Sequence, residues 1–223
     1  MEQRAKVQVP WSDIDTLLLD MDGTLLDLAF DNFFWNELVP EKYASATGLA
    51  PEAARAEVRA RYEAVIGTLP WYCIDHWTGE LGLDIGRLKR EHRHRIRYLP
   101  RAREFLALAR GRSKRLVLVT NAHRVTLSIK CEQTGIDRLM DTVVSSHDYG
   151  VEKEQASFWR RLADAEGIAP ERCLLLEDSL AVLGAATGFG VAHAIAICRP
   201  DTTLKARQID GYAAVDGVAS LIG

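Results

Sequence analysis

The sequence predicts an α/β fold, in which helices cover a parallel β-sheet and an α-helical segment is inserted after the first strand. Short apolar runs of strand length recur along the chain, and helical patterns alternate with them from about residue 100. Residues 28–98, in contrast, contain no strand-like run. Because parallel strands need crossover connections, the alternation indicates right-handed βαβ units, and residues 28–98 are too long for one crossover.

The composition is that of an ordinary globular protein of 223 residues, with 48% hydrophobic and 26% charged residues. A net charge of −3 excludes a global positive field that would attract nucleic acid or an anionic membrane. Residues 1–6 lead into no long apolar run, so we expect no signal peptide, no membrane span and a cytoplasmic location.

The four cysteines are widely spaced and form no Cys-x-x-Cys pair. This spacing indicates neither a zinc site nor a disulfide framework. Cys173 and Cys198 lie in apolar runs, where we expect them to be buried as small hydrophobic residues.

The first strand is expected over residues 16–19, an apolar run that ends abruptly in the segment 20–24, Asp-Met-Asp-Gly-Thr. A continuous apolar run bounded by a turn signal is typical of a strand buried on both faces. Open α/β sheets bind ligands at the carboxyl ends of their strands, and two close carboxylates need a compensating cation such as Mg²⁺. Taken alone, the same residues also fit an ordinary Asp-Gly turn.

Residues 28–98 are expected to form helices only. The stretch 44–64 is rich in Ala, Glu and Arg and has Pro51 at a first-turn position, and further helices are expected near 71–81 and over 85–98. The charged segment 87–97 has the composition of a nucleic-acid patch. Its helical pattern and the net acidic chain favour a solvated helix face instead.

From residue 100 onward helices and strands alternate. Helices are expected over 101–110, 123–134, 155–166 and 180–187, and strands over 116–119, 142–145, 173–176, 194–197 and 213–215. Gly111 and Gly135 stand where the C-caps of the first two of these helices are expected.

Polar side chains directly follow three of the strands: Asp20 and Asp22, Thr120 and Asn121, and Glu177, Asp178 and Ser179. Lys153 lies in a polar loop after a fourth strand. In a parallel sheet all these carboxyl ends open onto one edge, so we expect the groups to meet there. Carboxylates for a cation, hydroxyl and amide donors and an ammonium together suit chemistry at a phosphate.

The chemistry of such a site gives each group an expected role. Asp20, held at the strand end, would attack phosphorus and form an aspartyl-phosphate. Asp22 would protonate the leaving oxygen and then deprotonate the attacking water. Thr120 and Lys153 would hold the phosphoryl oxygens, and Mg²⁺ would bridge Asp20, the backbone carbonyl of Asp22 and Asp178.

These residues resemble the four motifs of the haloacid dehalogenase superfamily of phosphohydrolases, in order and over nearly the whole chain. The resemblance implies a Rossmann-like core domain, residues 1–27 and 99–223, and an α-helical cap domain, residues 28–98. It also implies Mg²⁺ as the cofactor and a phosphate-binding set made of Gly23, Thr24, Thr120, Asn121 and Lys153. Asp22 speaks against the dehalogenase branch, which lacks this second aspartate and uses no metal.

Two segments, residues 25–35 and 71–77, more narrowly resemble the bacterial GMP/IMP nucleotidase group. That resemblance implies a purine nucleoside 5′-monophosphate as the substrate. The sequence departs from many superfamily relatives at two positions: Glu154 follows the motif lysine in place of proline, and Val182 stands where a further acidic residue is common. We expect Glu177 to supply the second acidic group of the metal site, as a ligand or next to the ligands.

Other interpretations remain open at this point. The same motifs serve phosphatases and phosphomutases for small metabolites such as phosphoglycolate or a sugar phosphate, and a non-catalytic binding protein can share the fold. His123 and His147 lie near motif residues without an assigned role, and the oligomeric state is undetermined. One aromatic group fits either the core of a small cap or a stacking surface for a purine base: Phe33, Phe34, Trp35, Trp71, Tyr72 and Trp77.

Overall fold

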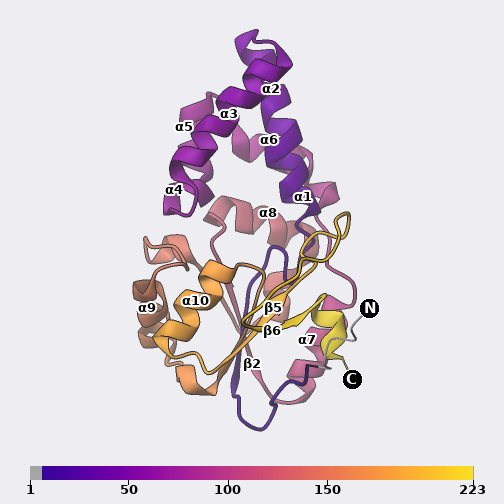
Figure 1. Cartoon of the computed structure of the whole chain (residues 1–223), viewed down its shortest axis with the longest axis vertical. Coiled ribbons are helices and arrows are strands. Elements are labelled where there is room, and N and C mark those ends of the chain that lie inside the picture. The colour runs from indigo at the N-terminus through magenta and orange to yellow at the C-terminus, as the bar shows by residue number, and fades with distance from the viewer. Residues whose placement is uncertain (1–6, 223) are drawn as a thin grey trace.

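The computed structural model describes residues 7–222 and contains a six-stranded parallel sheet with the order β3-β2-β1-β4-β5-β6 (Figure 1). The strands are β1 (Thr16–Leu19), β2 (Arg115–Thr120), β3 (Thr142–Ser145), β4 (Cys173–Glu177), β5 (His193–Ile197) and β6 (Ala213–Val215). Each predicted strand is present, and the α/β prediction is confirmed.

The central strands are apolar at nearly every position because the sheet is covered on both faces. In β1, Leu17 and Leu19 pack into one hydrophobic core, whereas Leu18 packs into the other. All three side chains are at most 1% exposed. Burial on both faces fixes the register of β1, so the residues that follow it have a defined place at the sheet edge.

Four helices cover the sheet, α7 (Ala102–Gly111) and α8 (Arg124–Thr134) on one face and α9 (Ala156–Glu166) and α10 (Leu180–Phe189) on the other. Their bounds lie within two residues of the predicted ones. Gly135 ends α8 with a φ of 66°, as its predicted capping role requires. The prediction for Gly111 is wrong, since this glycine is the last residue of α7 and Arg112 is the C-cap.

Residues 28–98, here called the helical insertion, lie over the carboxyl edge of the sheet (Figure 1). Their elements are α1 (Ala29–Phe33), a π-helix (Phe34–Leu38), α2 (Val39–Thr47), α3 (Pro51–Val65), α4 (Leu69–Tyr72), α5 (Ile74–Leu81) and α6 (Ile85–Glu91). Short 3₁₀ turns occur here and in the rest of the chain, at Arg93–Arg95, Ile136–Leu139, Ser146–Asp148, Pro170–Arg172 and Val218–Leu221.

The insertion is more divided than the sequence suggested. The helical stretch expected over 44–64 holds the end of one helix and most of another, because Gly48 ends α2 with a φ of 73° and Pro51 starts α3. The stretches near 71–81 and over 85–98 are likewise divided, the second ending as extended chain after Arg95. Pro51 does occupy the first turn of its helix, as predicted.

The two connections between the insertion and the rest of the chain run side by side. Leu26 and Tyr98 form an antiparallel bridge. On either side of it, the backbone N–H of Asp27 donates to Arg97 O at 2.9 Å and that of Leu99 donates to Leu25 O at 2.9 Å. The insertion is therefore attached at one place, close to the end of β1.

Two further expectations concern the cysteines and membrane-spanning helices. Cys173 and Cys198 are both buried, as predicted. Between residues 7 and 222 no helix has the length and apolar character needed to cross a membrane.

Candidate active site

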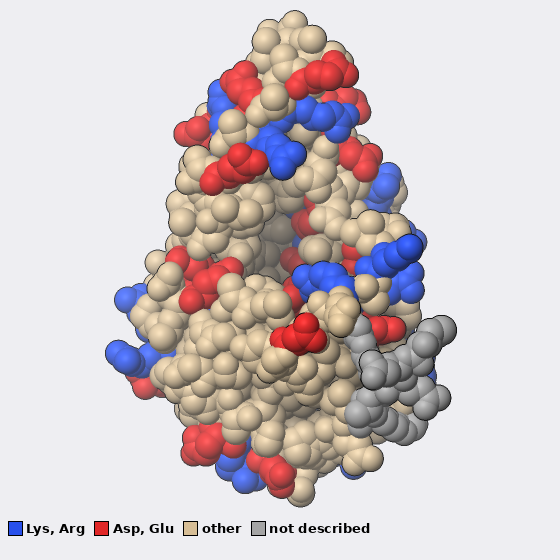
Figure 2. Space-filling view, viewed as in Figure 1, with Lys and Arg blue, Asp and Glu red and all other residues tan. Residues whose placement is uncertain are grey.

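A cavity of about 470 Å³ lies between the carboxyl edge of the sheet and the helical insertion. Figure 2 shows the molecule hollowed at this place. The volume is in the range of small-molecule binding sites. Seven predicted site residues line the cavity: Asp20, Asp22, Thr120, Asn121, Lys153, Glu177 and Asp178.

Lys153 is the buried centre of this group, with a side chain 2% exposed. Its ammonium donates to Asp20 Oδ1 at 2.6 Å, to Glu177 Oε2 at 2.7 Å and to the carbonyl oxygen of Val119 at 2.9 Å. Burial alone would lower the pKa of Lys153, but the two carboxylates outweigh it and hold that pKa above its usual value. The lysine is thus a fixed positive charge at the strand ends.

Asp20, Glu177 and Asp178, here called the acidic trio, each place a carboxylate oxygen within 4.8 Å of the others. Asp20 Oδ2 is buried and has no hydrogen-bond partner among residues 7–222. Three carboxylates around a single buried ammonium suit a hard divalent cation with oxygen ligands, so the donor set fits Mg²⁺.

The members of the acidic trio differ in how many of their carboxylate oxygens already accept hydrogen bonds. Glu177 Oε1 accepts from the backbone N–H groups of Asp178 and Ser179, at 3.1 Å and 3.0 Å, and Glu177 Oε2 accepts from Lys153. Both oxygens of Glu177 are therefore engaged. Asp178 is therefore better placed than Glu177 as a ligand, and Asp20 is the other candidate.

Gly23 and Thr24 do not line the cavity. Gly23 has a φ of +85°, and a Cβ on it would lie 2.9 Å from Asp178 Cγ and 2.8 Å from Pro200 Cβ. The glycine thus lets Asp178 approach the end of β1. Thr24 is fully buried in the turn that follows. The structure gives these two residues a place in the turn behind the site rather than a contact with the cavity.

Asn121 joins the loops that follow β2 and β3. Asn121 Oδ1 accepts from the backbone N–H of Lys153 at 2.9 Å, and Asn121 Nδ2 donates to Glu154 Oε2 at 2.9 Å. Glu154 Oε1 in turn accepts from the hydroxyl of Tyr72 at 2.6 Å. The glutamate that replaces the common proline therefore links the sheet edge to the helical insertion.

A second chain of ion pairs at the site was not predicted. Lys130 of α8 donates to Asp22 Oδ1 at 2.5 Å and to Asp31 Oδ2 at 2.6 Å, and Lys89 of α6 donates to Asp31 Oδ1 at 2.9 Å. Both lysines are 1% exposed and line the cavity. Asp31 therefore lies between two buried ammonium groups, and Asp22 is tied to the insertion through Lys130.

The expectation of a solvated face for segment 87–97 is only partly right. Its arginines are exposed, as predicted, but Lys89 is buried. The Lys89 ammonium lies 4.3 Å from the ring centre of Phe34 and is paired with Asp31. Lys89 therefore lines the cavity although it lies in a charged helix, because α6 faces the cavity at this position.

Burial dominates the protonation of the carboxyl groups. It raises the pKa of Asp20 to about 7, with the charge of Glu177 adding to the effect, and it raises the pKa of Asp178 to about 7, with Asp20 adding. Burial also raises the pKa of Asp22, and Asp31 adds while Lys130 opposes. For Asp31, the two lysines outweigh burial and hold the pKa below its usual value.

We expect the metal-free protein to lose stability as the pH rises from about 4 to about 7. Burial also raises the pKa of Glu177 to about 7, so all three carboxyl groups of the trio bind protons more tightly in the folded chain. Their stabilising contribution is complete below the unfolded values near 4 and disappears as the pH passes the folded values. Each tenfold change in proton affinity is worth about 1.4 kcal/mol, or roughly 3–6 °C in Tm.

Thermal unfolding in the presence of a chelator, at pH 5 and pH 8, measures this effect. Asp178→Asn should show a smaller loss of Tm between the two pH values than the wild type. Added Mg²⁺ should raise Tm more at pH 8 than at pH 5, because metal and protons compete for the same oxygens. Equal pH slopes for wild type and Asp178→Asn would contradict the assignment.

The aromatic residues of the insertion fall into two groups, one buried in its core and one lining the cavity. Phe34 and Trp77 are buried in the insertion, and the rings of Trp71 and Trp77 lie 6.0 Å apart in an edge-to-face contact. Trp35, Trp71 and Tyr72 line the cavity. An aromatic core therefore presents part of its surface to the site.

The sequence matches the family model of haloacid dehalogenase-like hydrolases over residues 14–190. It is 39% identical over 216 residues to the GMP/IMP nucleotidase YrfG of Escherichia coli (strain K12), with 97% of each chain covered.

Solved structures give a matching fold. A HAD phosphatase from Thermococcus onnurineus aligns with a TM-score of 0.78 at 20% identity, covering 93% of this chain and 96% of that one. CbbY from Rhodobacter sphaeroides, determined in complex with phosphate, aligns with a TM-score of 0.65 at 20% identity and covers 94% and 97% of the two chains.

Proposed function

The chain belongs to the haloacid dehalogenase-like hydrolases, and on that premise we propose that it is a Mg²⁺-dependent phosphatase that hydrolyses purine nucleoside 5′-monophosphates through an aspartyl-phosphate on Asp20. The observation that carries the proposal is Asp20 Oδ2, a buried carboxylate oxygen without a hydrogen-bond partner among the described residues. Asp20 lines the cavity, and the buried ammonium of Lys153 holds the other oxygen of the same carboxylate. This carboxylate is held in place with one oxygen available for attack on phosphorus.

The first step follows from these positions. Asp20 Oδ2 attacks phosphorus, the bond from phosphorus to the ester oxygen breaks, and Asp22 gives a proton to that leaving oxygen. The raised pKa of Asp22 favours the protonated form that this step needs. Thr120, Asn121 and Lys153 line the cavity and would hold the phosphoryl oxygens. Asp20 and Asp178 would hold Mg²⁺, which would supply positive charge against the oxygens of the transferred group.

In the second step, Asp22 takes a proton from a water molecule that attacks the phosphorus, and the bond to Asp20 breaks. The same carboxyl group thus acts first as acid and then as base. Lys130, at 2.5 Å from Asp22 Oδ1, holds this side chain in place through both steps.

We also propose that residues 1–27 and 99–223 form a core domain, and that residues 28–98 form a cap that closes over the cavity, with hinges near residues 26–28 and 98–100. Two observations support this. The two connections between the core and the insertion are paired by the bridge between Leu26 and Tyr98, so the two hinges lie together and move the whole insertion as one unit. Contacts between the two parts, such as that of Tyr72 with Glu154, close the cavity from the side of the insertion. Closure would exclude bulk water from the phosphoryl site.

The nucleotide part of the proposal rests on the named activity of the Escherichia coli relative and on the aromatic wall of the cavity. Trp35, Trp71 and Tyr72 come from the insertion, opposite the acidic trio. Stacking of a base on an aromatic side chain is worth about 1–3 kcal/mol. Such a wall can hold the leaving nucleoside while the strand ends hold the phosphate.

A panel of phosphate esters tests this function. With Mg²⁺ present, GMP and IMP should give higher kcat/KM for phosphate release than phosphoglycolate or sugar phosphates. A chelator should abolish release from all of them. Preference for the small acids would refute the nucleotide assignment in favour of a small-metabolite phosphatase. No release from any ester, including an aryl phosphate, would indicate a non-catalytic binding protein.

Trp71→Leu should raise KM for GMP by roughly 5- to 160-fold, the range that corresponds to the loss of one stacked base. The rate on an aryl phosphate too small to reach the insertion should change little. The matched control is Trp11→Leu, because Trp11 lies outside the cavity and packs against Arg112. An equal loss of activity on both substrates would show that Trp71 serves the fold and not the base.

A further inference from the structure

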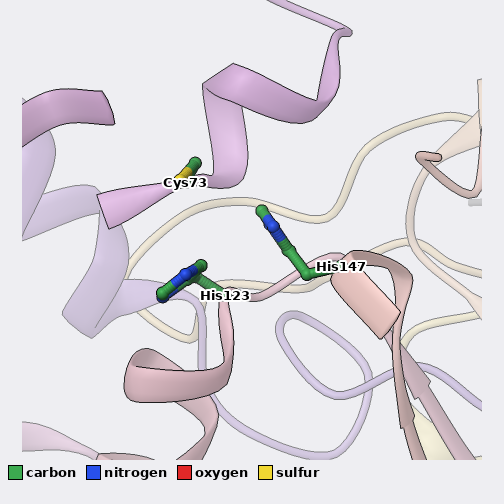
Figure 3. A group of neighbouring side chains, drawn as sticks. All are labelled: Cys73, His123 and His147. Carbon is green, nitrogen blue, oxygen red and sulfur yellow. The ribbon is translucent and has the colours of Figure 1, made fainter. Parts of the chain in front are cut away.

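A second cluster of metal-ligating side chains lies beside the cavity and takes no part in the proposed reaction. Cys73 comes from the connection between α4 and α5, His123 is the N-cap of α8, and His147 belongs to the 3₁₀ turn after β3. Their ligand atoms all lie within 4.8 Å of one another. Figure 3 shows the three side chains around one space, with Cys73 on the ribbon of the insertion and the histidines on the two loops below it.

His147 has a ring nitrogen without a partner. Its Nε2 is buried and makes no hydrogen bond to any described residue. Burial, together with the neighbouring His123 ring, lowers the pKa of His147, while a hydrogen bond to the backbone of Asn121 opposes the shift. A buried ring nitrogen without a partner is what a neutral histidine offers to a metal ion.

The two ring nitrogens of His123 make long contacts. Its Nδ1 accepts a long hydrogen bond of 3.4 Å from the backbone N–H of Val125, and its Nε2 lies 3.6 Å from Asp75 Oδ2. These neighbours favour a ring protonated at Nε2 with the lone pair on Nδ1. A carboxylate behind a metal-binding histidine is the usual arrangement that orients such a ring.

The ligand types select the class of metal. A thiolate with two imidazoles suits Zn²⁺ and similar soft or borderline ions, whereas the carboxylates of the acidic trio suit Mg²⁺. Ligand atoms of a tetrahedral zinc site lie about 3.5 Å apart, as follows from zinc–ligand distances of about 2.0–2.3 Å. The ligand atoms lie within 4.8 Å of one another, so each pair would approach by no more than about 1.3 Å. A water molecule would complete the tetrahedron.

We propose that Cys73, His123 and His147 bind one Zn²⁺ ion that ties the helical insertion to the loops at the sheet edge. Cys73 follows Tyr72 on one wall of the cavity, and His123 follows the cavity residues Asn121 and Ala122 on the other. A bound ion joins these two walls. It therefore stabilises the arrangement in which the insertion covers the cavity.

Cobalt binding tests the site directly. The reduced, chelator-treated protein is titrated with Co²⁺ while excess Mg²⁺ occupies the acidic trio. We expect one equivalent of Co²⁺ to produce a thiolate-to-cobalt charge-transfer absorption, which Zn²⁺ then displaces. Cys73→Ser should lose this absorption, and Cys131→Ser should keep it, since Cys131 is a half-buried thiol outside the cluster.

A second readout guards against a variant that fails to fold. Zn²⁺ should raise Tm in the wild type and in Cys131→Ser, but much less in Cys73→Ser and in His147→Gln. Mg²⁺-dependent phosphate release by these variants should stay within about threefold of the wild type, which shows that they are folded.

Three results would overturn the proposal: no charge-transfer absorption, its persistence in Cys73→Ser, or an equal rise of Tm with Zn²⁺ in every variant. The last result would place the ion on the acidic trio. Absence of phosphatase activity in the wild type would leave the spectra and the Tm shifts unchanged. Failure of the zinc site and failure of the proposed function are therefore distinguishable.

Discussion

Asp20→Asn should lower the rate of phosphate release from GMP by at least about 10⁴-fold while leaving the protein folded. An amide is a far weaker nucleophile than a carboxylate, and among the described residues Asp20 Oδ2 is the only buried carboxylate oxygen without a partner. The fold should tolerate the change, because the Lys153 ammonium keeps Glu177 Oε2 and the carbonyl of Val119 as acceptors. Initial rates, circular dichroism and Tm measure both parts of this expectation.

Asp15→Asn is the matched control for the nucleophile. Asp15 directly precedes β1, at the end of the strand away from the site, where its exposed carboxylate pairs with Arg172 at 2.7 Å. The same chemical change there should leave the rate unaltered. An Asp20→Asn variant that kept more than about a hundredth of the wild-type rate would remove Asp20 from its assigned role.

Lys130→Met should destabilise the protein by about 3–5 kcal/mol, the usual cost of removing one partner of a buried ion pair. It should also move the acid limb of the kcat profile to higher pH. Lys130 is the ammonium that opposes the effects of burial and of Asp31 on Asp22. Without it the pKa of Asp22 rises further, and the deprotonated form needed for the second step forms only at higher pH. Denaturant unfolding and kcat between pH 5 and 9 measure the two effects.

Lys130→Arg keeps the positive charge and should restore the pH profile, even if the larger guanidinium costs some stability. Lys42→Met is the surface control, since Lys42 is 39% exposed and, among residues 7–222, pairs only with Glu41. A folded Lys130→Met protein with the wild-type pH profile would show that Lys130 does not control Asp22.

The part of the site built on strand ends could be predicted because its determinants are local. The buried run of β1 fixes where the chain leaves the sheet, and the residues that follow it, Asp20 and Asp22, must then lie at the ligand-binding edge. Lys153 could be placed by the same argument. Parallel topology alone brings it to Asp20 across 133 positions of sequence.

The ion pairs of Asp22 and Asp31 could not be predicted in this way. Lys130 contacts Asp31 across 99 positions, and this contact depends on where the insertion sits over the sheet edge. One signal in the sequence was nevertheless present. Lys130 falls three residues after Leu127 and four after Thr126, on the buried face of α8, where an unpaired lysine would be costly.

The division of residues 44–64 also had a local signal. Gly48 is a helix stop and Pro51 is a helix start, and of the two the first-turn position of Pro51 was predicted. The cluster of Cys73, His123 and His147 had no such signal. Its ligands come from three separate loops and meet only in the folded chain.

The most direct measurement of the central claim is acid quenching of the enzyme during its first turnover of GMP carrying a labelled phosphate. Peptide mapping of the quenched protein should place the labelled phosphoryl group on Asp20, and the label should be absent from Asp20→Asn. Labelled phosphate released in the first turnover by Asp20→Asn, or a label carried by another residue of the wild type, would contradict an aspartyl-phosphate at this position.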